Sequence, residues 1–196
     1  MTELFSYEPE TQENSVKITS RKLKIQEKLK TKIFLKKEKA NQVLTELPKQ
    51  NESHFIISNG NFDYFTLIPI IIELLKSNID EFYFSTWTMN FQNVKLLLTL
   101  YDSGKIKKIS ALTGLYFKQR EANVYNELYE GLKKRNQKIF SNENHSKITL
   151  MKTPKANITI DGSANFTANP RIEQFTIHNN VELYEFNKNW MDCIIV

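Results

Sequence analysis

Cysteine is almost absent from this chain of 196 residues, in which Cys193 stands alone. One cysteine excludes an internal disulfide framework and is typical of a reducing compartment, so we expect a cytoplasmic location. Because Cys193 lies in the apolar run 193–196, we expect a core or partly buried thiol there rather than a nucleophile. Glycine and proline number five each, which excludes collagen-like and low-complexity chains.

Long hydrophobic runs are also missing. The longest apolar stretch, Leu67 to Leu75, contains Pro69 and Glu73 and is too short to cross a bilayer. The first ten residues are acidic where a secretory signal would have a positive region followed by an apolar run. We therefore expect an intracellular protein without a transmembrane segment.

Positive charge is in excess, with 27 Lys and Arg against 22 Asp and Glu and a net charge of +5. A polyanion is therefore the expected partner, nucleic acid first and anionic phospholipid as the alternative. Ten of the basic residues lie between Lys17 and Lys39, where Ile25, Leu29 and Ile33 recur at four-residue spacing. This spacing predicts an amphipathic basic helix or a strand–helix arm. Such an arm either packs its charged face on the domain or contacts phosphates, and Lys22, Lys24 and Lys28 are the candidate contacts.

The chain divides into a polar tail with a basic arm, 1–46, and one domain, 47–196. After Pro48, short β-prone runs alternate with helical stretches, which predicts an α/β fold. We expect a mixed, largely buried β-sheet flanked by helices on both faces. The predicted strands are His54–Ser58, Phe82–Thr86, Lys107–Leu112, Gln137–Ser141, Lys147–Met151, Asn157–Asp161 and Val181–Phe186. The predicted helices are Phe62–Lys76, Phe91–Asp102 and Lys118–Arg135.

The strands Lys147–Met151 and Asn157–Asp161 lack a helix between them, so they should form a hairpin turning at residues 153–155. His145 and Lys147 stand at the start of this hairpin, and Ser163 and Asn165 follow its end. Alternate residues of a strand face the same way, so the four side chains can converge. Imidazole, ammonium, hydroxyl and carboxamide supply a nucleophile, a cation and neutral donors for phosphate oxygens.

The order and separation of these residues resemble the phospholipase D superfamily. The family motif is His-x-Lys, four residues, Asp, and then Gly-Ser-x-Asn on the next strand. This chain has His145-x-Lys147 and Gly162-Ser163-Ala164-Asn165, while Lys152 occupies the position of the motif Asp. Asp161 is a candidate to replace that carboxylate.

The resemblance implies a metal-independent phosphodiesterase that needs no cofactor. His145 would attack phosphorus and form a phosphohistidine, and a second imidazole would protonate the leaving oxygen. Lys147 and Asn165 would hold the nonbridging oxygens with support from Ser163. An acidic residue would orient an imidazole, with Glu173 preferred and Glu182 as the rival. Arg171 is a further candidate for phosphate contact.

Only one motif copy is present, and the other two histidines, His54 and His178, are expected to be structural. A second catalytic imidazole therefore predicts a homodimer with the site across its two-fold axis and an interface that includes Phe166 and Ile172. A nuclease is the preferred activity. A phosphate-binding module without turnover and a phospholipid-directed enzyme are the alternatives. The aromatic residues Tyr83, Phe84 and Trp87 are expected in the core rather than in base stacking.

Overall fold

The computed structural model describes residues 21–25, 30–33, 44–58, 63–167 and 171–195. It contains one nine-stranded sheet of strand order β2-β1-β3-β9-β8-β7-β4-β5-β6. The strands are β1 (Arg21–Ile25), β2 (Lys30–Ile33), β3 (Glu52–Ser58), β4 (Glu81–Thr86), β5 (Ile109–Gly114), β6 (Lys138–Asn142), β7 (Ile148–Lys152), β8 (Asn157–Gly162) and β9 (Glu173–Asn179). The helices are η1 (Tyr64–Thr66), α2 (Leu67–Leu75), α3 (Phe91–Asp102), α4 (Leu115–Arg120), α5 (Ala122–Lys134) and α6 (Val181–Ile194).

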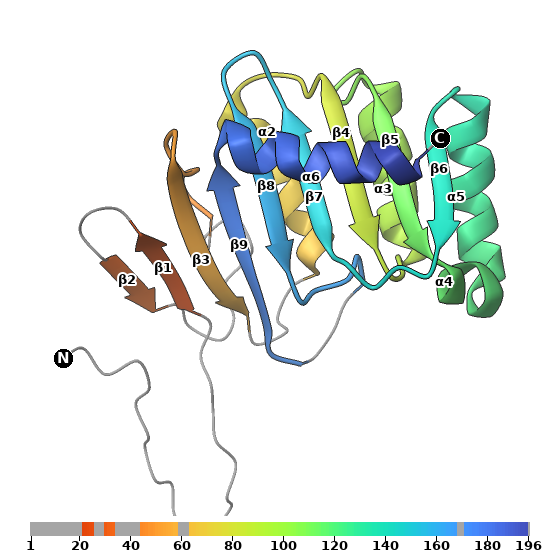
Figure 1. Ribbon diagram of the computed structural model, residues 1–196, viewed down its shortest axis with the longest axis horizontal. Coiled ribbons are helices and arrows are strands. Elements are labelled where there is room, and N and C mark those ends of the chain that lie inside the picture. Colours follow the sequence, from red (N-terminus) through yellow and green to blue (C-terminus); the bar gives the residue numbers. More distant parts are fainter. Residues whose placement is uncertain (1–20, 26–29, 34–43, 59–62, 168–170, 196) are drawn as a thin grey trace, which may run out of the picture.

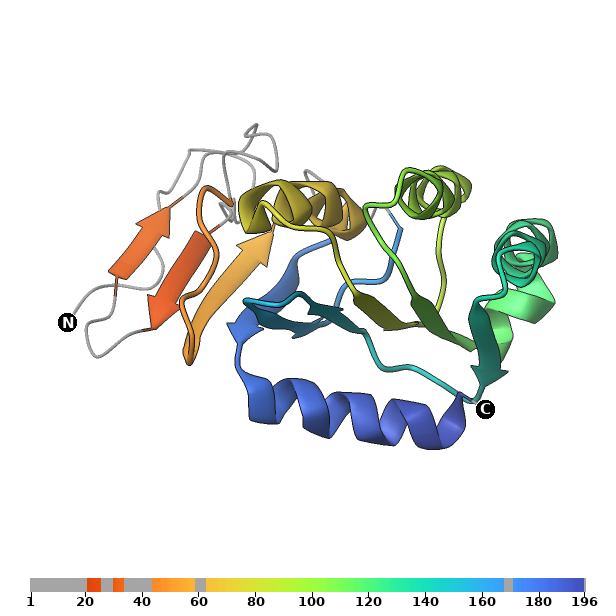
Figure 2. The ribbon, with the colours of Figure 1, turned by 90° about the horizontal axis from the view of Figure 1, so that it is seen from above.

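The sheet is mixed and carries helices on both faces, as predicted. Strands β4, β5 and β6 run parallel through helical crossovers, whereas the other neighbouring pairs are antiparallel. Helices α2, α3 and α5 cover one face, and α6 crosses the other face (Figures 1 and 2). Apolar residues of the first three helices form the larger core with the sheet, and those of α6 form a smaller one. The sheet is thus buried on both sides over its centre.

The predicted strands from His54–Ser58 to Asn157–Asp161 are confirmed within two residues at each end, and Phe91–Asp102 is confirmed as helix α3. The hairpin is also confirmed, because β7 and β8 are antiparallel and pair Ile148 with Asp161. Thr153 forms its turn, in which the Thr153 hydroxyl accepts hydrogen bonds from the backbone N–H groups of Lys155 and Ala156. The prediction Lys118–Arg135 covers two helices, α4 and α5.

Two predictions of secondary structure are wrong. Val181–Phe186 is the start of helix α6 and not a strand, because the Asn180 side chain accepts a hydrogen bond from the Leu183 N–H and caps the helix. Residues 21–25 and 30–33 of the basic arm are strands, and β1 pairs with β3. The predicted helix is therefore wrong for these residues, in which only the strand of the alternative strand–helix arm is found. Of the remaining residues in the segment 1–46, the structure describes 44–46.

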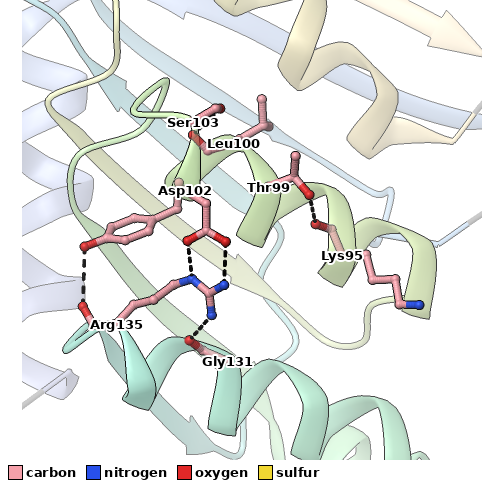
Figure 3. Close-up of polar contacts among 8 residues, drawn as sticks. Lys95, Thr99, Leu100, Asp102, Ser103, Gly131 and Arg135 are labelled. Atoms are coloured by element: carbon pink, nitrogen blue, oxygen red, sulfur yellow. Dashed lines mark hydrogen bonds and ion pairs between the residues drawn. The ribbon is translucent and has the colours of Figure 1, made fainter.

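Helices α3 and α5 are joined at their C-terminal ends by an ion pair (Figure 3). Arg135 donates from Nε and Nη2 to the two carboxylate oxygens of Asp102, at 2.7 and 2.5 Å, and from Nη1 to the carbonyl of Gly131. Gly131 allows close packing, because a Cβ there would lie 2.6 Å from Leu98 Cδ1. The crossover helices are thereby fixed to each other on one face of the sheet. In the described part of the chain, no helix is both long and apolar enough to cross a membrane.

Candidate active site

The candidate site lies at one edge of the sheet, where many strand ends meet. Strands β3, β4, β5, β6 and β8 end at this edge, while β7 and β9 begin there. It is the lower edge in Figure 1, and α6 crosses the sheet nearer to the opposite edge. The carboxyl ends of parallel strands are a common place for ligand sites in open α/β sheets.

The segment that carries His145 is anchored to β4 on both sides of the imidazole. Asn144 Oδ1 accepts hydrogen bonds from the Ser146 N–H at 3.1 Å and from Ser85 Oγ at 3.1 Å, and Asn144 Nδ2 donates to the Thr86 carbonyl. Ser146 Oγ lies 2.5 Å from Ser85 Oγ. The neighbours of His145 are therefore held in place while its own ring stays exposed.

Lys147 folds back over His145. Its ammonium lies 3.0 Å from His145 Nδ1 and 2.5 Å from the His145 carbonyl oxygen. Because an ammonium can only donate, Nδ1 accepts, and the proton of a neutral ring then resides on Nε2. The resting site thus contains an imidazole with one nitrogen engaged by a cation.

The pKa of Lys147 is lowered below its ordinary value of 10.5. Partial burial at the sheet edge disfavours the charged form, and the carboxylate of Glu173 opposes this effect. The electrostatic interaction between Lys147 and Glu173 brings the start of β7 and the start of β9 into one site. Perturbed pKa values of this kind are common at functional sites.

Ser163 joins the end of β8 to the start of β9. Its hydroxyl donates a short hydrogen bond to a Glu173 carboxylate oxygen and accepts one from the Gln174 N–H at 3.1 Å. Gly162 makes this possible, because a Cβ there would lie 2.3 Å from the Gln174 carbonyl oxygen. The two strands approach at a point that only glycine permits.

Asn165 is oriented by the residue that follows β4. Its Oδ1 accepts a hydrogen bond from the Trp87 N–H at 3.3 Å, and the Trp87 ring lies 5.3 Å from the His145 ring, centroid to centroid. Trp87 therefore contacts both the candidate nucleophile and the candidate phosphate-binding amide. The bond uses Oδ1, which leaves the amide donors of Asn165 for another partner.

The next residue, Phe166, fixes this segment to the core. Its ring is 1% exposed, and its carbonyl oxygen accepts hydrogen bonds from the Asn90 N–H and from Asn93 Nδ2, both at 3.0 Å. The Asp63 carboxylate holds both asparagine side chains, at 2.7 and 2.8 Å. Burial of Phe166 corrects the expectation that it contributes to a dimer interface. Ile172, also expected there, is 52% exposed.

Sequence reasoning missed an aromatic pair at this edge. Tyr83 and Phe84 are buried as predicted, but Trp87 is only partly buried and stacks on Tyr116, with ring centroids 4.4 Å apart and an interplanar angle of 28°. Gly114 makes the space, because a Cβ there would lie 2.6 Å from Trp87 Cδ1. The signal in the sequence was the position of Trp87 directly after a strand end, where a side chain leaves the core.

Lys152 and Glu182 lie away from the site, whereas Asp161 is near the site end of β8, where it pairs with Ile148. Lys152 is at the far end of β7, where its ammonium is 3.7 Å from the Glu185 carboxylate of α6. Asp161 is 3.3 Å from His178 Nε2, an ion pair when that ring is protonated. Glu182 is in the first turn of α6, beyond the end of β9 that is remote from the site. Cys193, expected in the core or partly buried, is exposed near the C-terminal end of the same helix. Position 152 therefore cannot supply a carboxylate beside His145, and Glu173 is the acidic residue near Lys147.

The two remaining histidines also lie toward the opposite edge. His54 is fully buried in β3 and pairs with Ile177, while His178 pairs with Ser53. Of the basic candidates, Arg171 is exposed two residues before β9. The backbones of Lys22 and Lys24 belong to β1, and Lys28 lies outside the described residues. No group of three His, Cys, Asp or Glu suited to a metal ion occurs among the residues that the structure describes.

No protein-family model and no curated protein matches the chain. Solved structures with a similar fold include a polyphosphate kinase from Porphyromonas gingivalis, with a TM-score of 0.56 and 16% identity. The match covers 72% of this chain and 26% of the kinase. They also include Nuc, a phospholipase D family member from Salmonella typhimurium (TM-score 0.48, 15% identity, 64% of this chain and 84% of Nuc). A third is TrmBL2, an archaeal chromatin protein that binds DNA (TM-score 0.47, 8% identity, 70% of this chain and 50% of TrmBL2). At these identities the likeness concerns the fold, and the kinase shares the arrangement of sheet and helices described above.

Proposed function

We propose that the protein is a metal-independent phosphodiesterase of phospholipase D type that acts on nucleic acid. The observation that carries this proposal is one connected set of contacts at the sheet edge. Lys147 binds His145 and interacts with Glu173, which binds Ser163, while Trp87 contacts both His145 and Asn165. The five candidate catalytic residues are thus linked by these contacts, although two turns separate them along the chain.

In the first step, phosphate binding draws the ammonium of Lys147 from His145 to a nonbridging oxygen. The freed ring nitrogen attacks phosphorus, so that an N–P bond forms while the P–O bond to the leaving group breaks. A protonated second imidazole transfers its proton to the leaving oxygen. Asn165 and Ser163 would stabilise the charge on the remaining oxygens.

In the second step, water attacks phosphorus and the N–P bond breaks, which releases His145. One proton of the water returns to the second imidazole, and the enzyme is restored. The other two histidines of the chain lie toward the far edge of the sheet, so we propose that the second imidazole is the partner subunit's His145 in a homodimer. Lys22, Lys24, Lys28 and Arg171 are proposed to contact the phosphate backbone outside the site.

The test is turnover of plasmid DNA and RNA in EDTA by the wild-type protein and by His145→Ala. We expect wild-type activity to survive EDTA, because no step requires a divalent ion, and we expect the variant to lose activity by at least about a thousandfold. His145 is exposed, so the variant should keep the wild-type unfolding temperature. The matched control is His178→Gln, which removes a histidine far from the site and should retain activity.

Loss of wild-type activity in EDTA with rescue by a divalent ion would contradict this mechanism. Binding of nucleic acid without any turnover would instead indicate a phosphate-binding module. Hydrolysis of anionic phospholipid vesicles in preference to DNA and RNA would identify the lipid as the substrate.

A further inference from the structure

We infer that Trp87, Tyr116 and Arg120 form a nucleotide subsite beside His145, and that the substrate is therefore single-stranded nucleic acid. An unpaired base next to the scissile phosphate would stack on the aromatic pair, and Arg120 would bind a flanking phosphate. This inference rests on the proposed function and specifies the form of its substrate.

The aromatic pair is adjacent to the candidate nucleophile. The Trp87 ring centroid is 5.3 Å from that of His145 and 4.4 Å from that of Tyr116. Tyr116 is 40% exposed, so part of its ring faces solvent instead of the core. Exposed aromatic rings within one nucleotide of a phosphate site are the usual means of holding an unpaired base.

The position of this pair is not explained by core packing. Tyr83 and Phe84 on the same strand are buried, whereas Trp87 follows the strand and reaches out over Gly114. Because residue 114 is glycine and has no side chain, the Trp87 indole can pack against its backbone. The fold therefore holds Trp87 at the surface beside His145.

Arg120 completes the arrangement with a positive charge. It lies one helical turn after Tyr116 on α4, and its guanidinium carbon is 5.9 Å from the Tyr116 ring centroid. Among the described residues no carboxylate pairs with Arg120. An arginine that is held near an aromatic ring without an acidic partner is suited to bind phosphate and to stack on a base.

Single-stranded nucleic acid is favoured over duplex because of this geometry. The bases of a duplex are stacked on one another and paired, so their faces are not accessible to Tyr116 unless a base is unpaired, unstacked and flipped out. A single strand presents its base faces directly. The stack would thus select single strands or unpaired ends in either DNA or RNA.

The experiment measures binding separately from turnover. The chain has two tryptophans, and Trp190 lies on α6, so Trp190→Phe leaves Trp87 as the only indole. Oligothymidylate, an abasic oligonucleotide of equal length and charge, and a duplex of the same length are titrated against this variant at fixed salt. We expect oligothymidylate to quench the Trp87 fluorescence and to bind about tenfold more tightly than the abasic strand.

Substitutions at Tyr116 then test the stack. Tyr116→Leu should lose about tenfold in affinity for oligothymidylate and leave the affinity for the abasic strand unchanged, while Tyr116→Phe should restore tight binding. The matched control is Phe186→Leu, which changes an exposed aromatic residue of α6 and should alter neither affinity. Unfolding temperatures identify any variant that has lost its fold.

Equal affinity for the two oligonucleotides, or tighter binding of duplex than of oligothymidylate, would overturn the subsite. Quenching and base-dependent affinity without any turnover by the wild-type protein would support the subsite and contradict the proposed phosphodiesterase activity. The two conclusions are thereby distinguishable.

Discussion

The ammonium of Lys147 is partly shielded from water, and this lowers its pKa below the ordinary value of 10.5. In the proposed mechanism only the charged form binds the phosphate oxygens. As the pH rises through the lowered pKa, the lysine loses its proton. Activity should therefore begin to fall at a lower pH than it would with an unperturbed lysine.

Lys147→Arg tests this relation, because a guanidinium stays charged throughout the alkaline range. We expect about tenfold lower kcat/KM for this variant at neutral pH, because the geometry of the two cations differs. We also expect no decline in its kcat/KM up to pH ~10, because the guanidinium stays charged. The measurement is kcat/KM against pH for both proteins. An identical alkaline decline in both would show that another group titrates.

The placement of the motif residues could be predicted from the sequence, whereas that of their neighbours could not. His145, Lys147, Ser163 and Asn165 stand at fixed distances along a hairpin, so local periodicity was sufficient to place them at one strand end. Tyr116 is remote in sequence and reaches the site only because β5 lies beside β4 in the sheet. Pairing of distant strands is a property of the whole fold and leaves little local signal.

The contact between β8 and β9 depends on Gly162, and this gives a prediction for the strand pair. In Gly162→Ala the new methyl group would meet the backbone of Gln174 and Phe175 at 2.3 and 2.7 Å. The strands must then separate, so we expect a loss of about 2–3 kcal/mol in the free energy of unfolding. Activity should also fall, because Ser163 and Glu173 follow the displaced backbones.

Gly104→Ala is the matched control. Gly104 has a φ of 71°, which strains an alanine, but no atom lies within 4 Å of the added methyl group. This variant should lose about 1 kcal/mol and keep its activity. Urea unfolding measures both losses, and a smaller loss for Gly162→Ala than for Gly104→Ala would contradict the packing argument.

The errors in the predicted elements have physical causes. Val181–Phe186 is rich in β-prone residues, but Asn180 caps a helix that buries Tyr184, Asn187 and Met191 on one face. Strand β9 was missed because Phe175 and Ile177 are its only buried apolar residues and polar residues surround them. In both segments tertiary contacts decide the structure and local propensity does not.

At the level of the assembly, the mechanism requires two copies of His145 around one phosphorus. We expect the molar mass of the active protein, measured by sedimentation, to be twice the 23.1 kDa of one chain. We also expect one covalent phosphate for every two chains when turnover is stopped in alkali, because each dimer would hold one site. Intact-mass measurement of the trapped intermediate gives this ratio.

A monomer that retains full activity, or one phosphate on each chain, would contradict the dimer. The contact surface should adjoin the site and include Ile172, which is 52% exposed. Ile172→Glu is expected to shift the protein toward the monomer and to reduce activity, while leaving the unfolding temperature of the dilute monomer unchanged.

The strand order has a consequence for synthesis of the chain. Strand β3 is made early, yet one of its two neighbours is β9, which emerges more than a hundred residues later. Strands β4, β5 and β6 can assemble with their helices first, but β7, β8 and β9 must then enter between them and the waiting β3. The nascent chain therefore carries an unpaired strand edge for most of its translation, and slow or interrupted translation should expose it to aggregation.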